Sequence, residues 1–380
     1  MTTYDWIVIG AGITGASLAY ELNQQNFKVL LVEQNPEPNN ATQYSYGGLA
    51  YWSGTNELTR ALAAEGIELH RHLSAELDGD TEFRELDLVL TVDRQDDPEA
   101  VAQNYDRFTV TPEILNVQDA CVLEPLLNPN AISGVLRLPH GQIQAQKTTA
   151  AYIRALIRHG GAIVYERAVD LIRRDRQIIG IKTETNIYHG QNTVVCAGGL
   201  SRSLLQQNNI AIDHHFTHAY AITTPPVELE LATVVMPAIQ QRFALEAALE
   251  YDGDPIGERT ILDPGAVQFI DGSMCLGQIS SISPGLPLEL DRAEAQIREQ
   301  VGNILPLLED IPGTCHHCLV AFNNRAIALV GNLADISGLH LFSGFTSTLV
   351  YAPVLARRFA KSQAGTKDRV IEQLQQVLDR

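Results

Sequence analysis

Residues 6–33 read WIVIGAGITGASLAYELNQQNFKVLLVE, and this stretch sets the architecture of the chain. It begins with an apolar run typical of a buried strand and continues into a Gly-x-Gly-x-x-Gly motif at Gly10, Gly12 and Gly15. Residues 16–22 then have helical spacing, and residues 28–33 read as a second strand that closes on Glu33. This order of elements predicts a β-turn-α-β unit at the start of the chain.

The glycine motif predicts dinucleotide binding. Gly10 permits a tight turn, Gly12 lets backbone amides approach a diphosphate, and Gly15 allows close helix–strand packing. The N-terminus of the following helix supplies partial positive charge. Glu33 lies 21 residues past Gly12, where a carboxylate can accept hydrogen bonds from ribose hydroxyls. The alternative, a turn with incidental glycines, does not explain why all these features occur together.

Composition narrows the class of protein and its partners. The 380 residues carry 45 acidic and 27 basic side chains, so the formal net charge is −18, which argues against nucleic acid as a partner. Five widely spaced cysteines do not form a disulfide framework and indicate a reducing compartment. The first residues lack a basic signal-peptide region, and no apolar run has the length of a membrane span. We therefore expect a cytoplasmic protein without stable membrane insertion.

Hydrophobic periodicity predicts further elements along the chain. Helices are expected at 57–77, 98–108, 148–159, 290–305, 348–362 and 367–379. Strands are expected at 86–92, at 131–138 up to Pro139, at several places within 162–195, throughout 215–280, and at 326–330 and 339–342.

The residues after Glu33 favour a flavin over a nicotinamide. An NAD enzyme normally continues with regular βαβ units, whereas this chain enters a polar loop that contains Pro36, Pro38 and the Gly47-Gly48 pair. Such a loop suits close packing against a bulky cofactor. A colourless NAD-dependent dehydrogenase remains the alternative.

Here the chain resembles the DAO-type FAD-dependent oxidoreductases, the superfamily of glycine oxidase, sarcosine oxidase and the small D-amino-acid dehydrogenases. The resemblance rests on the first 33 residues and on the segments 41–48, 141–171, 194–199, 271–277, 328–331 and 339–353. It implies an α/β fold in which a Rossmann-like FAD-binding domain is joined to a second, mostly antiparallel sheet-plus-helices substrate domain. The first domain would be discontinuous, with residues 1–85, 140–210 and 322–380, and the second would hold 86–139 and 211–321.

The resemblance also implies the residues that contact FAD. We expect them to be Gly10, Gly12, Ile13, Thr14, Gly15, Glu33, Gln34, Thr42, Ser45, Tyr46, Gly47, Gly48, Leu49, Val169, Ala197, Gly198, Gly344, Phe345, Thr346, Ser347 and Thr348. Either Thr346 or Ser347 is a natural N-cap for the helix that follows, whose positive end would face the flavin ring.

The chain departs from the family pattern where substrate binds. Many members place an arginine for the substrate carboxylate at the position of Val320, and commonly have glycine at the positions of Ser347 and Leu349. Arg325 is our candidate replacement for this arginine, because bidentate capture of a carboxylate needs a guanidinium. Weaker candidates are Arg60 and Arg242. Tyr220 is the candidate for orienting substrate, with Tyr46 and Tyr51 as further possibilities.

The motif Cys315-His316-His317-Cys318 is not expected to bind metal. A zinc site needs four converging ligands, and alternate residues of a strand point to opposite faces. Cys318 lies near the position where some family members attach flavin covalently, although packing thiols are the favoured interpretation. His214, His215 and His218 are likewise interpreted as packing or surface residues.

Together these observations predict an FAD-dependent amino acid or amine oxidase or dehydrogenase. It would oxidise a C–N bond by hydride transfer to flavin N5, and the imine would then hydrolyse. One alternative is oxidation of the C–O bond of a hydroxy acid or polyol, and another is an FAD-binding protein with a degenerate site. Substrate identity, the electron acceptor (O₂, a quinone or another) and the oligomeric state are left open.

Overall fold

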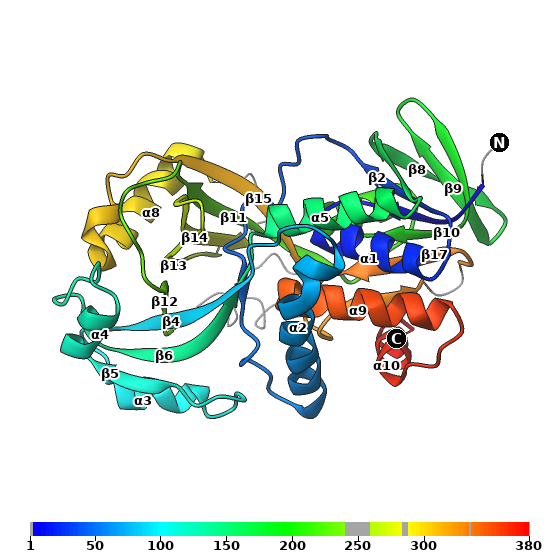
Figure 1. Cartoon of the computed structure of the whole chain (residues 1–380). Helices are drawn as coiled ribbons and strands as arrows, with labels where there is room; N and C mark the ends of the chain where they lie inside the picture. The colour runs from blue at the N-terminus through cyan, green and yellow to red at the C-terminus, as the bar shows by residue number, and fades with distance from the viewer. Residues whose placement is uncertain (1–2, 240–258, 283–287, 334–335, 380) are drawn as a thin grey trace.

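The computed structural model describes residues 3–239, 259–282, 288–333 and 336–379. Two large sheets lie side by side, each with its own helices (Figure 1). None of the helices in these ranges is both long and apolar enough to cross a membrane.

The first sheet is built around the N-terminal strand. Its strands run in the order β16-β17-β10-β1-β2-β7, with β8 and β9 attached through β10. Pairing is parallel from β17 to β7, and only β16 and the β8–β9 hairpin are antiparallel. The strands are β1 (Thr3–Ile9), β2 (Val29–Glu33), β7 (Ala162–Tyr165), β8 (Ala168–Arg174), β9 (Gln177–Thr183), β10 (Ile187–Val195), β16 (Leu329–Asn332) and β17 (Leu339–Ser343).

Both faces of this sheet are buried, which explains why β1 reads as a continuous apolar run. Trp6 and Val8 pack into the core formed with α1 (Ile13–Gln24), α5 (Ala145–Arg158) and α9 (Thr348–Gln363). Ile7 and Ile9 point to the opposite face, where they join a second core. Helix α2 (Glu57–Glu76) packs against α9, and α10 (Arg369–Leu378) covers β16. A short helix, α6 (Ser201–Gln207), contacts β8.

The second sheet is mostly antiparallel, as expected. Its order is β15-β11-β14-β13-β12-β4-β6-β3, with β5 beside β6, and only β12 and β4 pair in parallel. The strands are β3 (Gly48–Leu49), β4 (Arg84–Asp93), β5 (Glu113–Asn116), β6 (Ile132–Gln142), β11 (His215–Thr223), β12 (Val234–Pro237), β13 (Arg259–Gln268), β14 (Met274–Ile282) and β15 (Thr314–Phe322). Helix α8 (Leu290–Ile304) packs on one face over β11, β13, β14 and β15.

Several expected elements have different limits. The strand expected at 326–330 is β16, at Leu329–Asn332, and the helix expected at 148–159 is α5, which begins at Ala145. The helix expected at 98–108 is only α3 (Pro98–Ala102) and one 3₁₀ turn. The strand expected to end at Pro139 continues to Gln142. Proline is tolerated there because β5 borders β6 only as far as Arg137 and β3 begins only at Gly141. The missing N–H of Pro139 therefore need not interrupt a ladder on that edge. A further short helix, α4 (Val117–Leu123), was not expected.

Candidate functional site

A cavity of about 380 Å³ lies where the parallel strands of the first sheet end. It runs past the ends of β1, β2, β10 and β17 and reaches residues 317–321 of β15, the edge strand of the second sheet. Ligands in open α/β sheets bind at this kind of position. Twelve of the residues expected to contact FAD line it: Gly10, Gly12, Ile13, Thr14, Glu33, Gln34, Thr42, Ala197, Gly198, Gly344, Phe345 and Thr348.

Gly10 and Gly15 are packed too closely to carry a side chain. A Cβ atom on Gly15 would lie 1.8 Å from the carbonyl oxygen of Gly10. One on Gly10 would lie 2.6 Å from the carbonyl oxygen of Cys196, and the φ of Gly10 is +99°. This packing brings β1, α1 and β10 together at the floor of the cavity, as the motif requires.

The start of α1 is arranged to face an anionic group. Gly12 is the N-cap and contributes no side chain, and the N–H of Ile13 instead donates to the Thr42 hydroxyl at 3.1 Å. Gly12, Ile13 and Thr14 all line the cavity. A helix N-terminus that borders the cavity fits the diphosphate of a dinucleotide.

Glu33 is fixed at the cavity wall by backbone amides. Its Oε2 accepts from the N–H of Ala11 at 2.8 Å, and its Oε1 accepts from the N–H of Asn35 at 3.3 Å. A carboxylate has about four lone-pair positions, so acceptor capacity remains for ribose hydroxyls. The cavity is open beside Gly198, since no protein atom lies within 4 Å of the position that a Cβ would take there. The site therefore fits FAD at its adenosine and diphosphate end.

The other end of the cavity lies at the turn into α9. Gly344 has a φ of +65°, and Phe345 and Thr348 line the cavity beside it. The expected capping role is corrected here. Ser347 holds the N-cap position but adopts a left-handed conformation with no side-chain capping bond. The hydroxyl of Thr346 donates to the carbonyl of Ile327 at 3.4 Å instead. The N-terminus of α9 is therefore not capped by its own hydroxyls.

The remaining residues expected to contact FAD do not line the cavity. Gly15 and Gly47 sit against backbone carbonyls, and Gly48 and Leu49 form β3 in the second sheet. These residues, together with Ser45, Tyr46, Val169, Thr346 and Ser347, stay predictions as cofactor contacts.

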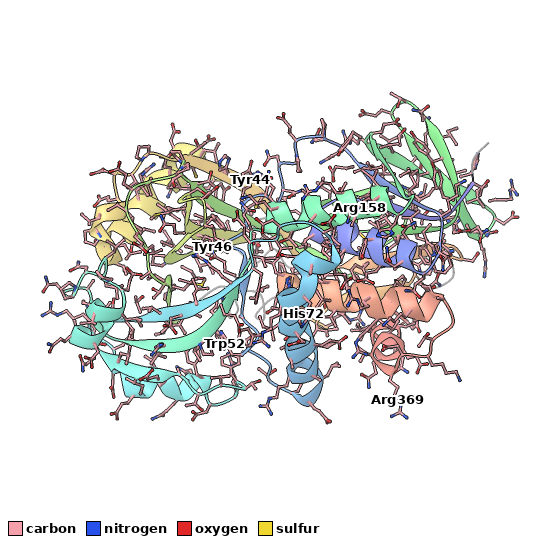
Figure 2. The ribbon with its side chains drawn as sticks, viewed as in Figure 1. Tyr44, Tyr46, Trp52, His72, Arg158 and Arg369 are labelled. Carbon is pink, nitrogen blue, oxygen red and sulfur yellow. The ribbon has the colours of Figure 1, made fainter. Side chains whose placement is uncertain are left out.

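Two tyrosines considered for substrate binding differ in burial, since Tyr220 is fully buried and Tyr46 is partly buried. Tyr220 is fully buried in the core beneath α8, with its ring 5.0 Å from that of His317. The hydroxyl of Tyr46 is buried and has no hydrogen-bond partner among the described residues. Burial raises the pKa of both phenols. Figure 2 labels Tyr44 and Tyr46, which lie where the two sheets approach each other.

Two of the candidate arginines, Arg325 and Arg60, do not line the cavity. Arg325 is 3.8 Å from the Asp213 carboxylate, which also bonds His215 at 2.9 Å. Arg60 donates to the backbone carbonyls of Gly54 and Arg107. Arg242 lies outside the described residues. Val320, by contrast, lines the cavity.

The Cys-His-His-Cys motif alternates between the two faces of β15. Cys315 packs into the core under α8, whereas Cys318 lines the cavity. His316 stacks on Tyr44 with ring centroids 4.1 Å apart, and His317 bonds His218 at 2.8 Å. Desolvation lowers the pKa of these three histidines. Within the described ranges, no group of three or more His, Cys, Asp or Glu side chains is placed to hold a metal.

Sequence reasoning missed several residues that line the cavity. They include Asn39, Asn40, Glu166, Arg167, Ser203, Gln207 and Ser343. Glu166 and Arg167 follow β7, which pairs with β2 next to Glu33. Knowledge of this strand order would therefore have predicted that the two residues lie near the cavity. Ser203 and Gln207 carry no such signal, because only the packing of α6 brings them to the cavity.

Comparisons with known proteins agree with this geometry. The profile of the FAD-dependent oxidoreductases named DAO matches residues 5–362. The 4-methylaminobutanoate oxidase (formaldehyde-forming) of Paenarthrobacter nicotinovorans is 24% identical over 372 residues, which are 93% of this chain and 43% of that protein. One subunit of the anaerobic glycerol-3-phosphate dehydrogenase of Escherichia coli K12 is 27% identical over 208 residues, 51% of this chain and 37% of that one. The chain thus spans less than half the length of these curated relatives.

Among solved structures, glycine oxidase from Bacillus cereus has the same fold, with a TM-score of 0.77 and 18% identity over the whole of both chains. The expected α/β fold class and the expected cofactor, FAD, are confirmed. The profile match over residues 5–362 leads to one conclusion: the chain belongs to the DAO family of FAD-dependent oxidoreductases.

Proposed function

We propose that this protein oxidises the C–N bond of an amino acid or small amine, with FAD as the oxidant. The observation that carries the proposal is the continuous cavity from Glu33 to β15, which would leave a bound flavin between the two sheets. FAD supplies the chemistry, because it accepts two electrons and a hydrogen from the substrate carbon. Water then converts the resulting imine into a carbonyl compound and an amine.

The chain's own residues would orient the substrate and keep the reacting carbon dry. The part of the cavity lined by β15 is formed by His317, Cys318, Leu319, Val320 and Ala321. Desolvation lowers the pKa of His317, so this wall carries no positive charge at neutral pH. A neutral wall favours the unprotonated amine, which is the form that loses a hydride.

The names of similar proteins support the C–N class without fixing the substrate. Glycine oxidase and 4-methylaminobutanoate oxidase are both named for the oxidation of amino compounds. Because Val320 replaces the usual arginine, secondary amines without a carboxylate belong in the search together with amino acids.

A spectrum of the purified protein followed by an anaerobic reduction screen tests the proposal. We expect a yellow protein whose visible flavin absorbance bleaches with an amino acid or an amine. Reduction by hydroxy acids alone would overturn the proposal. Bound FAD that no compound reduces would favour the degenerate-site alternative instead.

One relative supports a second candidate function. The similarity to the glycerol-3-phosphate dehydrogenase covers half of the chain. Oxidation of a polyol phosphate requires a base for the hydroxyl proton and cations for the phosphate. Glycerol 3-phosphate therefore belongs in the same screen, and bleaching by this compound but by no amine would select that function.

A further inference from the structure

Two residues at the connections between the sheets reach the turn that leads into α9. His214 immediately precedes β11, and Asn323 immediately follows β15. The Nε2 atom of His214 lies 2.9 Å from the Ser343 hydroxyl, and the Asn323 side chain donates to the carbonyl of Gly344 at 2.6 Å. Ser343 ends β17 and lines the cofactor cavity. The cluster therefore holds the last residue of the strand against the cavity.

His214 has no exposed surface, and one of its ring nitrogens lacks a hydrogen-bond partner among the described residues. No described residue offers a partner to Nδ1. Burial lowers the pKa of this histidine to about 4, so the ring is neutral at physiological pH. A neutral imidazole carries one hydrogen, on either Nδ1 or Nε2.

The position of that hydrogen follows from the cost of burying polar atoms. A hydrogen on Nδ1 would be a buried donor without an acceptor, which folded proteins rarely contain. A hydrogen on Nε2 is donated to Ser343 and leaves only a bare lone pair on Nδ1. We therefore assign the Nε2–H tautomer, in which Ser343 is the acceptor.

With this tautomer, the hydroxyl hydrogen of Ser343 is not used in the bond to His214 and can be donated elsewhere. A serine hydroxyl has one hydrogen and two lone pairs, and His214 occupies a lone pair. Ser343 donates to no other described residue, and its side chain is 2% exposed. We infer that Ser343 donates its hydroxyl hydrogen to an acceptor atom of bound FAD, and that His214 is the positioning residue that directs this hydrogen into the cavity.

The inference rests on FAD binding by this family and not on the proposed substrate. It is tested by diluting the holoprotein and following the release of FAD by its fluorescence. Ser343→Ala is expected to raise the dissociation constant about threefold to tenfold, the effect of one hydrogen bond. A shift in the midpoint potential as well would place the contact on the flavin ring, and affinity loss alone would place it on the rest of FAD. An unchanged dissociation constant and potential would overturn the inference.

A double-mutant cycle separates positioning from mere packing. His214→Leu should weaken FAD binding in the wild-type background and have no further effect in the Ser343→Ala background. His214→Gln keeps an amide donor and should recover most of the affinity; it also serves if the leucine variant fails to fold. The matched control is His340→Gln, since His340 is buried on the same strand but does not line the cavity. If the increases in the FAD dissociation constant caused by His214→Leu and Ser343→Ala simply multiply in the double variant, His214 does not act through Ser343.

Discussion

The imidazole of His70 replaces the hydrogen-bond donor that Pro353 lacks. Pro353 lies inside α9 and has no N–H, so the carbonyl of Leu349, four residues earlier, loses its helical partner. The Nε2 atom of His70, on α2, lies 2.8 Å from that carbonyl oxygen. His70 is buried, and this contact requires its hydrogen to be on Nε2. A side chain from α2 thus completes the first turn of the helix that begins at the cavity.

We expect His70→Leu to reduce the free energy of unfolding by about 1–3 kcal/mol, because it leaves a buried carbonyl without a donor. In a Pro353→Ala background the backbone N–H returns, and the same leucine substitution should have a clearly smaller effect. Urea unfolding of the four proteins measures this. Equal losses in both backgrounds would show that His70 matters only through its packing.

Four buried histidines should make stability depend on pH. Burial lowers the pKa of His70, His140, His214 and His340 to about 4, well below the usual value of 6.5. Between these values the unfolded chain binds more protons than the folded one. The free energy of unfolding therefore falls as pH drops from about 6.5 to about 4, by up to about 1.4 kcal/mol per pH unit for each histidine.

Urea unfolding at pH 7 and pH 5 measures this dependence, and His340→Gln should flatten it. Burial raises the pKa of Glu21, to about 7, and that of Glu124. These two carboxyl groups act in the opposite direction, but the four histidines outnumber them. A protein that is more stable at pH 5 than at pH 7 would refute the prediction.

Gly198 and Gly160 provide a matched pair for testing the cavity. Both have positive φ, +54° and +87°, and a Cβ on either would meet no protein atom within 4 Å. Alanine at each position should therefore cost a similar, small amount of stability, about 1 kcal/mol. Only Gly198 lines the cavity, so Gly198→Ala should weaken FAD binding at least tenfold, whereas Gly160→Ala should leave it unchanged. Fluorescence of released FAD reports the difference.

We expect Arg325 to stabilise the local structure and not to bind the substrate. Its guanidinium is 3.8 Å from Asp213 and lies outside the cavity lining. Arg325→Ala should therefore change KM by a similar, small factor for an amino acid and for the amine that lacks its carboxylate. A KM that rises tenfold or more for the amino acid alone would instead restore Arg325 as the carboxylate-binding residue.

The adenosine and diphosphate end of the site could be predicted from the sequence because its determinants are local. Gly10, Gly12 and Gly15 are needed by one turn, and Glu33 follows one strand later, so chain connectivity already fixes their spacing. For the cavity wall formed by β15, only the family resemblance pointed to Val320 and Cys318; local pattern could not, because this wall exists only when the edge of the second sheet meets the first.

Local pattern was thus enough to predict the βαβ unit and the dinucleotide site, since short-range periodicity and glycine geometry leave few alternatives. The family was identified from a resemblance of segments that are spread along the chain. Long-range packing was needed to show that Val320 and Cys318 line the cavity, that Arg325 faces Asp213, and that Ser343 is paired with His214. These contacts join residues that are distant in the chain, and burial determines which polar atoms must find partners there. Neither distance nor burial can be read from a short run of residues.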